Sequence, residues 1–347
     1  RKRRKRGRKV KVSTICAALV AFLTGAFGFA QKVQDTQYLY AYEQNLSEQE
    51  AVSFGEVWGY VMNGREYEFS QQMPVTDLCC FSADINHYGE ISSYPDLSKF
   101  EGFKGRKHLV VTCESRSLSH LVLEPKFGIA KKIARELAKA SVDYDGIQID
   151  FELVPVRDAE NFRRFLKLLR SKLPKEKMLS VCVPARLRSV EDDVYSYTML
   201  EPLADRIIVM AYDQHWSTSK SGPVAGMDWG ERIAEYSCSV IPKNKIVMGM
   251  PFYGRTWVDE NFGKAWYNSG VNRILNENGV KQVERKDGVP NFSFTAQVCV
   301  TGWFDDAQSL LQRCRLYGGM GIDNVAFWRI GQEDPAIWNY LNVDEKK

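Results

Sequence analysis

Eight short apolar runs, separated by stretches with helical periodicity, constrain the fold of this chain most strongly. The runs are Val57–Met62, Asp77–Ile85, His108–Cys113, Tyr144–Glu152, Leu179–Pro184, Arg206–Tyr212, Ile246–Pro251 and Asn324–Trp328. The amphipathic stretches between them include Pro125–Ser141, Asp158–Leu173 (with Asp158 placed as an N-cap), Trp229–Ser239 and Asp306–Tyr317. Strands that alternate with helices pair in parallel, and eight of them can close a barrel. The pattern therefore predicts an α/β fold, a (β/α)8 TIM barrel.

The interval from Thr256 to Gly302 departs from this alternation. It shows no clean helical pattern, and its aromatic residues are scattered among Gly and Asn. Because a structureless loop of that length is uncommon inside a compact domain, we expect a small inserted subdomain at about residues 256–302. The interval follows the seventh strand, so the insert would lie between strand 7 and helix 7, on the face where barrel active sites lie.

The first 30 residues differ in composition from the rest of the chain. A basic run ends at Lys11, and Val12–Ala30 is apolar, with small residues at its end as in a signal-peptidase site. We expect residues 1–30 to be a signal peptide or, since the apolar stretch nearly spans a bilayer, an uncleaved N-terminal anchor. Either interpretation predicts an exported protein (periplasmic, cell-surface or secreted) that contacts the membrane only through such an anchor. Residues 31–55 would be a linker, and residues 56–345 the barrel.

The excess of positive charge in the chain comes from that first segment. Nine of the 47 Lys and Arg residues precede residue 30, so 38 basic residues face 43 acidic ones afterwards, a net charge of −5. A mildly acidic folded part gives no reason to expect a nucleic-acid partner. Seven Cys residues follow residue 30 without metal-site spacing, so we expect structural thiols, no metal and no cofactor. We also expect a monomer.

The fourth predicted strand carries three polar residues in file. In Asp145–Glu152 (DGIQIDFE) apolar residues alternate with Gln148, Asp150 and Glu152, so in a strand these three share one face. A buried carboxylate that is neither paired nor solvated is costly, and such a row is therefore either exposed to water or in use. In a barrel the row would face the interior, with Glu152 projecting at the C-terminal end.

Other predicted strands end in residues that suit a sugar ligand. The sixth ends in Met210-Ala211-Tyr212-Asp213, the eighth ends in Trp328, and Arg255 follows the seventh. An acid, a phenol and a Trp that converge on one mouth offer hydrogen bonds for hydroxyl groups and a flat face for a sugar ring.

Together these motifs resemble glycoside hydrolase family 18, the chitinase-type barrels. The family hallmark Asp-Gly-x-Asp-x-Asp-x-Glu matches Asp145–Glu152, except that Gln148 replaces one Asp. Further matches, in register from about Val57 to Tyr340, are Met210–Asp213, Gly249–Arg255, Trp303–Asp306 and Trp328. The ending Phe327–Gly331 and the compact insert look most like the branch that contains bacterial spore-cortex N-acetylglucosaminidases.

The resemblance implies a glycosidase of the chitinase or N-acetylglucosaminidase type, which cleaves β-1,4-linked N-acetylglucosamine glycans of peptidoglycan or chitin with retention. The mechanism would be substrate-assisted. Glu152 would protonate the glycosidic oxygen, an ionised Asp150 would hold the acetamido N–H, and Tyr212 would bond the acetamido carbonyl. The candidate substrate-binding residues are Gln148, Met210, Asp213, Trp328, Tyr60 and Arg255.

Two questions follow from this resemblance. A non-hydrolytic chitinase-like lectin is the alternative function, although such relatives typically lose the acid, and Glu152 is present. The second question concerns Gln148, whose amide could donate a hydrogen bond to Asp150. A hydrogen bond to the charged form favours ionisation, so we expect Gln148 to keep Asp150 charged to lower pH.

Overall fold

The computed structural model describes residues 43–258, 268–286, 289–295 and 297–344. The chain divides into two units, Arg1–Ser47 and Glu48–Lys347. Only residues 43–47 of the first unit are described, so the predicted signal peptide or anchor lies outside the described residues. Within the described ranges, no helix combines the length and the apolar character needed to cross a membrane.

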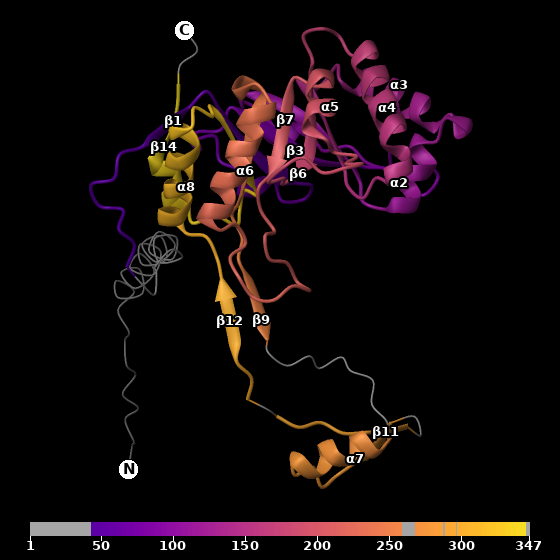
Figure 1. Ribbon diagram of the computed structural model, residues 1–347, viewed down its shortest axis with the longest axis vertical. Helices are drawn as coiled ribbons and strands as arrows, with labels where there is room; N and C mark the ends of the chain where they lie inside the picture. Colours follow the sequence, from indigo (N-terminus) through magenta and orange to yellow (C-terminus); the bar gives the residue numbers. More distant parts are fainter. Residues whose placement is uncertain (1–42, 259–267, 287–288, 296, 345–347) are drawn as a thin grey trace, which may run out of the picture. The chain divides into compact units, whose positions relative to one another are not determined.

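Eight parallel strands of the second unit form a closed barrel, which confirms the predicted (β/α)8 fold (Figure 1). The order around the barrel is β13-β2-β3-β4-β5-β6-β7-β8. The strands are β2 (Glu56–Met62), β3 (Asp77–Asp84), β4 (Arg106–Cys113), β5 (Gly146–Phe151), β6 (Met178–Pro184), β7 (Arg206–Met210), β8 (Ile246–Pro251) and β13 (Asn324–Trp328). Each predicted apolar run therefore corresponds to one barrel strand.

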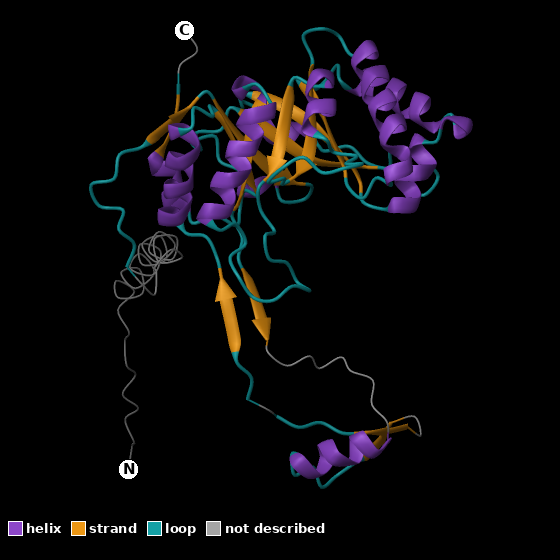
Figure 2. Ribbon diagram, viewed as in Figure 1, coloured by secondary structure: helices purple, strands orange, loops and turns teal. Residues whose placement is uncertain are grey.

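Helices cover the outside of the barrel strands (Figure 2). They are α2 (Arg116–Leu123), α3 (Ile129–Ala140), α4 (Ala159–Lys172), α5 (Tyr197–Leu200), α6 (Met227–Val240) and α8 (Ala307–Gly319). Short 3-10 helices are η1 (Glu66–Glu68), η2 (Leu97–Phe100), η3 (Pro125–Phe127), η4 (Val156–Asp158), η5 (Glu201–Leu203), η6 (Lys243–Lys245) and η7 (Pro335–Tyr340). The helical periodicity explains this layer, since α4 buries Phe162, Phe165, Leu166 and Leu169 at spacings of three and four.

The predicted N-cap of α4 does not act through its side chain. Asp158 occupies the N-cap position, but its side chain makes no capping hydrogen bond. Its carboxylate instead binds His120 Nδ1 at 2.8 Å and Asn161 Nδ2 at 3.1 Å, and so links α2 to α4. At α8 the cap does form, because Asp306 accepts the backbone N–H of Ser309 at 2.8 Å.

The inserted segment lies between β8 and α8 and contains regular structure. β9 (Arg255–Val258) pairs antiparallel with β12 (Val300–Trp303), and β10 (Glu284–Lys286) pairs with β11 (Val289–Asn291). The expectation that the interval has no clean helix is wrong, because α7 spans Asn268–Glu277. Val271, Ile274 and Leu275 have helical spacing there, but surrounding Asn and Gly residues, which are poor helix formers, obscure the pattern.

The start of the folded unit also differs from its predicted position. β1 (Val52–Phe54) pairs in parallel with β14 (Leu341–Val343), and Phe54 is only 1% exposed. Residues at the end of the predicted linker, 31–55, therefore belong to the folded unit, because their backbone hydrogen-bonds to the last strand.

A buried ionic network closes the N-terminal end of the barrel. Glu56 accepts hydrogen bonds from Arg106 at 2.5 Å and from Arg206 at 2.7 Å. Asp77 binds Arg106 Nε at 2.6 Å and His108 Nε2 at 2.7 Å. Burial raises the pKa of Asp77, but the bonds to His108 and Arg106 outweigh it and lower the pKa from 3.8 to about 2. This network thus stabilises the barrel at the end opposite Glu152.

We expect Asp77→Asn to lower the free energy of unfolding at pH 7 by about 3–5 kcal/mol, because a buried ion pair that loses one partner leaves the other uncompensated. The folded-state pKa of Asp77 lies below its ordinary value, so the wild-type protein loses this stability as the pH falls from about 4 to about 2. Urea unfolding at pH 7, 4 and 2 measures both effects.

The matched control is Glu90→Gln, which removes a carboxylate from the exposed pair with Lys132 and should change stability little. Equal stability of Asp77→Asn and wild type at pH 7 would contradict the role of this network.

Candidate active site

A cavity of about 400 Å³ lies at the C-terminal ends of the barrel strands. Eight of the nine predicted site residues line it: Tyr60, Asp150, Glu152, Met210, Tyr212, Asp213, Arg255 and Trp328. They come from different strands, and the parallel barrel brings the ends of those strands to one mouth. The ninth, Gln148, is fully buried and does not line the cavity.

Strand β5 carries the polar residues from the barrel interior to the mouth. Gln148 is 0% exposed and Asp150 is 7% exposed, while Glu152 follows the last residue of the strand and is exposed. On the outer face of β5, Phe151 stacks on Phe165 of α4 with ring centroids 5.4 Å apart. This packing fixes the alternation that directs Asp150 and Glu152 inward.

Asp150 is a buried carboxyl with an unpaired oxygen. Its Oδ1 atom is shielded from solvent and has no hydrogen-bond partner. Burial, followed by the charge of Glu152, raises the pKa of Asp150 to about 7. Partial burial and the charges of Glu114 and Asp213 raise the pKa of Glu152 as well.

These pKa shifts modify the expected charge pattern. An ionised Asp150 beside a protonated Glu152 does not describe the site without substrate, because the pKa of Asp150 is raised to about 7. Two carboxyls whose pKa values are both raised, one of them by the charge of the other, favour a single proton on the pair. A hydrogen-bond donor to its unpaired oxygen would favour the ionised form of Asp150.

Gln148 does not supply that partner. Its hydrogen bonds go to Tyr60 (OH to Oε1, 2.6 Å), Cys182 (Sγ to Oε1, 3.4 Å), Ser180 (Nε2 to Oγ, 3.2 Å) and Cys79 (Nε2 to Sγ, 3.8 Å). The prediction that its amide donates to Asp150 and keeps it charged to lower pH is therefore wrong. The competing partners come from β2, β3 and β6, which the sequence of β5 alone could not position.

Tyr212 lies beside Asp150 at the edge of the cavity. Burial, followed by the nearby Cys182 and Asp150, raises the pKa of its phenol well above the ordinary value, so the hydroxyl remains a donor. Gly249 makes room for the ring: a Cβ at this position would lie 2.8 Å from the carbonyl oxygen of Val209 and 3.1 Å from Cε1 of Tyr212. A residue of β8 thus sets the position of a side chain that follows β7.

Trp328 supplies an aromatic surface in the cavity. Its ring lies 5.2 Å from the ring of Tyr60 and 4.7 Å from the ring of Phe81, which meets it edge-on. These contacts hold the indole in one orientation. A fixed indole beside two carboxyls suits a ring with one apolar face and polar substituents.

The side chains of Asp213 and Arg255 form an ion pair with each other. Arg255 Nη2 donates to Asp213 Oδ1 at 2.7 Å, and the hydroxyl of Tyr253 donates to the same oxygen at 2.7 Å. Both predicted residues line the cavity, but each is oriented by the other. Direct contact of Arg255 with substrate stays a prediction.

Several lining residues were not predicted: Glu114, Phe81, Cys182, Tyr253, Gly254 and Gln332. Glu114 directly follows β4, so the strand-end rule that identified Glu152 could have identified it. Cys182 lies in an apolar run, where the sequence predicts a structural thiol. It is 4% exposed, and all seven cysteines among the described residues are free thiols.

One group of potential metal ligands occurs among the described residues, away from this cavity. Ligand atoms of His120, Glu124 and Asp158 lie within 4.8 Å of one another. The carboxylate of Asp158 already binds His120 and Asn161. We therefore assign this group to the packing of α2 against α4.

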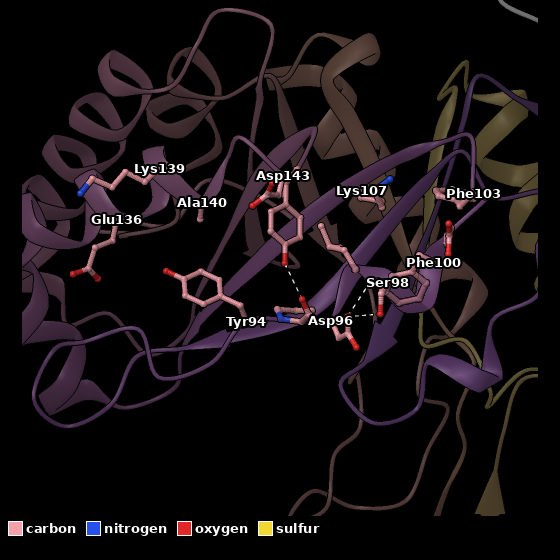
Figure 3. A pocket seen from close by; sticks show the side chains of 15 residues that line it. Tyr94, Asp96, Ser98, Phe100, Phe103, Lys107, Glu136, Lys139, Ala140 and Asp143 are labelled. Atoms are coloured by element: carbon pink, nitrogen blue, oxygen red, sulfur yellow. Dashed lines mark hydrogen bonds between the residues drawn. The ribbon is translucent and has the colours of Figure 1, made fainter.

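A larger cavity, of about 1130 Å³, lies near the N-terminal ends of β4 and β5 (Figure 3). Tyr94, Phe100, Lys107, Glu136 and Lys139 are among its lining residues. None of its lining side chains, all within the described part of the chain, has a buried nitrogen or oxygen atom without a hydrogen bond. The unpaired carboxyl oxygen of Asp150 identifies the smaller cavity as the candidate active site.

Comparisons with known proteins identify the family of the chain. The family model of glycosyl hydrolases family 18 matches residues 119–333, more than half of the chain. A cortical fragment-lytic enzyme of Bacillus anthracis is 26% identical over 211 residues, which cover 56% of this chain and 48% of that protein. A putative sporulation-specific glycosylase, YdhD, of Bacillus subtilis is 34% identical over 121 residues, 33% of this chain and 28% of that protein. The matched segments thus span half or less of these relatives.

Solved structures share the fold. The spore cortex-lytic enzyme SleL of Bacillus cereus superimposes with a TM-score of 0.68 at 20% identity, over 86% of this chain and 76% of that chain. A chitinase of Chromobacterium violaceum gives a TM-score of 0.64 at 25% identity, over 82% and 97% of the two chains. The closed barrel, the acids at the end of β5 and the family match lead to one conclusion: the chain belongs to glycosyl hydrolases family 18, a family of glycosidases.

Proposed function

We propose that this chain is a retaining glycoside hydrolase that cleaves β-1,4-linked N-acetylglucosamine glycans by substrate-assisted catalysis. The observation that carries the proposal is the unpaired Oδ1 of Asp150, which is buried in the same cavity as Glu152, Tyr212 and Trp328. A buried acceptor without a partner is costly unless a ligand donates to it. An acetamido N–H is such a donor.

Glu152 is the general acid in this proposal. Its raised pKa favours the protonated form, and its exposure at the mouth gives the glycosidic oxygen access to the proton. After the bond breaks, the carboxylate accepts a proton from the attacking water. The same side chain therefore serves both steps.

The 2-acetamido group of the bound sugar is the nucleophile. Its carbonyl oxygen attacks the anomeric carbon and forms a cyclic oxazolinium ion, which water then opens. Asp150 accepts the acetamido N–H and stabilises the developing positive charge, while the hydroxyl of Tyr212 donates to the acetamido oxygen. Trp328 lies beneath the sugar ring. Two displacements at one carbon retain the anomeric configuration.

The polymer is peptidoglycan or chitin in this proposal. The names of the relatives, cortical fragment-lytic enzyme and chitinase, fit the two possibilities. Both polymers present an N-acetylglucosamine with the required acetamido group. The exported location, as a periplasmic, cell-surface or secreted protein, is part of the same proposal, and its predicted segment 1–30 lies outside the described residues.

The test is to incubate the full chain with chitotetraose and with peptidoglycan glycan strands. We expect new reducing ends from at least one substrate, and the first product seen by proton NMR should be the β-anomer. First release of the α-anomer would contradict the retaining mechanism. Binding of both glycans without new reducing ends would instead support the lectin function.

A further inference from the structure

A second cavity, of about 410 Å³, adjoins the candidate active site. Glu152, Cys182 and Met210 line both cavities, whereas Asp150, Tyr212 and Trp328 line only the first. Glu152 therefore stands at the junction. If the first cavity holds the sugar that is attacked, as the proposed function requires, the proton donor separates that sugar from its leaving group. The second cavity then receives the leaving group.

The walls of this second cavity are mainly aliphatic. Its apolar lining residues include Leu153, Val154, Val156, Val190 and Val194. Leu153, Val156 and Val190 are 47%, 59% and 49% exposed, so their alkyl groups are available to a ligand. Exposed apolar side chains that gather beside a catalytic group commonly mark a binding surface.

The aromatic residues of the second cavity, Phe151 and Tyr195, serve the packing of the protein. Phe151 is 1% exposed. The hydroxyl of Tyr195 donates to the carbonyl oxygen of Phe151 at 2.7 Å and accepts the N–H of Val154 at 3.0 Å. The first cavity, in contrast, has the indole of Trp328. The second cavity therefore suits an alkyl group better than the flat face of a sugar ring.

The backbone conformation of Leu153 places an exposed apolar side chain next to Glu152. Leu153, directly after Glu152, has φ of 56°, a left-handed conformation that a bulky residue rarely adopts. Asp192 in the facing loop has φ of 53°. Such strained residues persist only where the surrounding structure holds them, and here they shape both sides of the cavity.

The charged residues that line the second cavity restrict further which ligands can bind there. The acidic residues that line the cavity are Glu152, Glu191, Asp192 and Asp193, and the basic ones are Arg116 and Arg186. Arg186 is already paired with Asp193 through bonds of 2.7 and 2.9 Å. Because Glu152 holds its proton as the general acid, the remaining charges are the carboxylates of Glu191 and Asp192 and the guanidinium of Arg116, so a carboxylate on the ligand would meet a net negative charge.

We propose that this second cavity is a leaving-group pocket that selects an uncharged aliphatic substituent on the leaving group. Leu153, Val156 and Val190 determine that specificity, and the surplus of carboxylates discriminates against an anionic substituent of the same length.

The test uses three β-glycosides of N,N′-diacetylchitobiose, with methyl, n-hexyl and 5-carboxypentyl aglycones, and chitotetraose as the reference. We expect kcat/KM for the hexyl glycoside to exceed that for the methyl glycoside by about tenfold or more, since each buried CH₂ favours binding by about fourfold. The carboxypentyl glycoside should lose most of this gain. The readout is the hexyl-to-methyl ratio, which does not depend on the absolute rate.

Val190→Asp should bring that ratio towards one. The matched control Val142→Asp makes the same change at a valine that is 75% exposed and lies outside both cavities, and it should leave the ratio unchanged. Cleavage of chitotetraose with a wild-type ratio near one, or a ratio that Val190→Asp does not alter, would overturn the leaving-group pocket alone. No cleavage of any of the four compounds, and none of peptidoglycan glycan strands, would overturn the proposed function together with it.

Discussion

Glu152→Gln should lower kcat by about 10²–10⁴-fold, the usual contribution of a general acid. The amide keeps the size of the side chain and its hydrogen bonding but cannot donate the proton, so affinity for the glycan should change little. Initial rates of reducing-end release from chitotetraose, together with calorimetric binding, separate the two effects. The same variant should lower the pKa of Asp150, because the charge of Glu152 is one cause of its elevation.

The matched control for this variant is Glu160→Gln on α4, an exposed carboxylate that pairs with Arg163 and Arg164 outside the candidate active site. Its kcat should equal that of the wild type. If kcat of Glu152→Gln also stayed at the wild-type value, Glu152 could not be the acid.

Removal of the acetyl group from the sugar that is attacked should be more damaging still. A well-placed internal nucleophile is equivalent to a concentration on the order of 10⁵ M or more, so its loss should lower turnover by about 10⁵-fold. The free amine also cannot form the cyclic intermediate. Mass spectrometry of products from chitotetraose and from the fully deacetylated tetramer measures the difference.

A tetramer deacetylated only at its reducing-end sugar is the control, because it keeps acetyl groups on the other three sugars. Each of its three glycosidic bonds follows an acetylated sugar, so it should be cleaved at a rate close to that of chitotetraose. Efficient cleavage of the fully deacetylated tetramer would rule out substrate assistance, whatever the outcome for Glu152→Gln.

The sequence predicted the barrel because parallel strands follow simple rules. Runs such as Ile246–Pro251 are apolar and of strand length, and the helices between them bury residues at spacings of three and four. The site was predictable for the same reason, since the end of each strand specifies where its side chains meet. Asp150 and Tyr212 could be assigned to one mouth before any distance was known.

Other features depended on contacts between distant segments, and a local pattern could not reveal them. The amide of Gln148 binds Tyr60 and Ser180, which are 88 and 32 residues away in the sequence. Asp158 binds His120 instead of its own helix. The second cavity combines the loop after β5 with the loop after β6, and neither loop has a distinctive motif.

The layer beneath Asp150 has a consequence for proton movement. Gln148 stands on the same strand face one position deeper, and its carboxamide neither gains nor loses a proton at ordinary pH. Such a group cannot pass a proton along the strand from Asp150 to the barrel interior. The proton held by Asp150 and Glu152 then exchanges with water through the two cavities that Glu152 lines. Once a glycan and its leaving group fill both, the pair reacts with the proton that it held when the glycan bound.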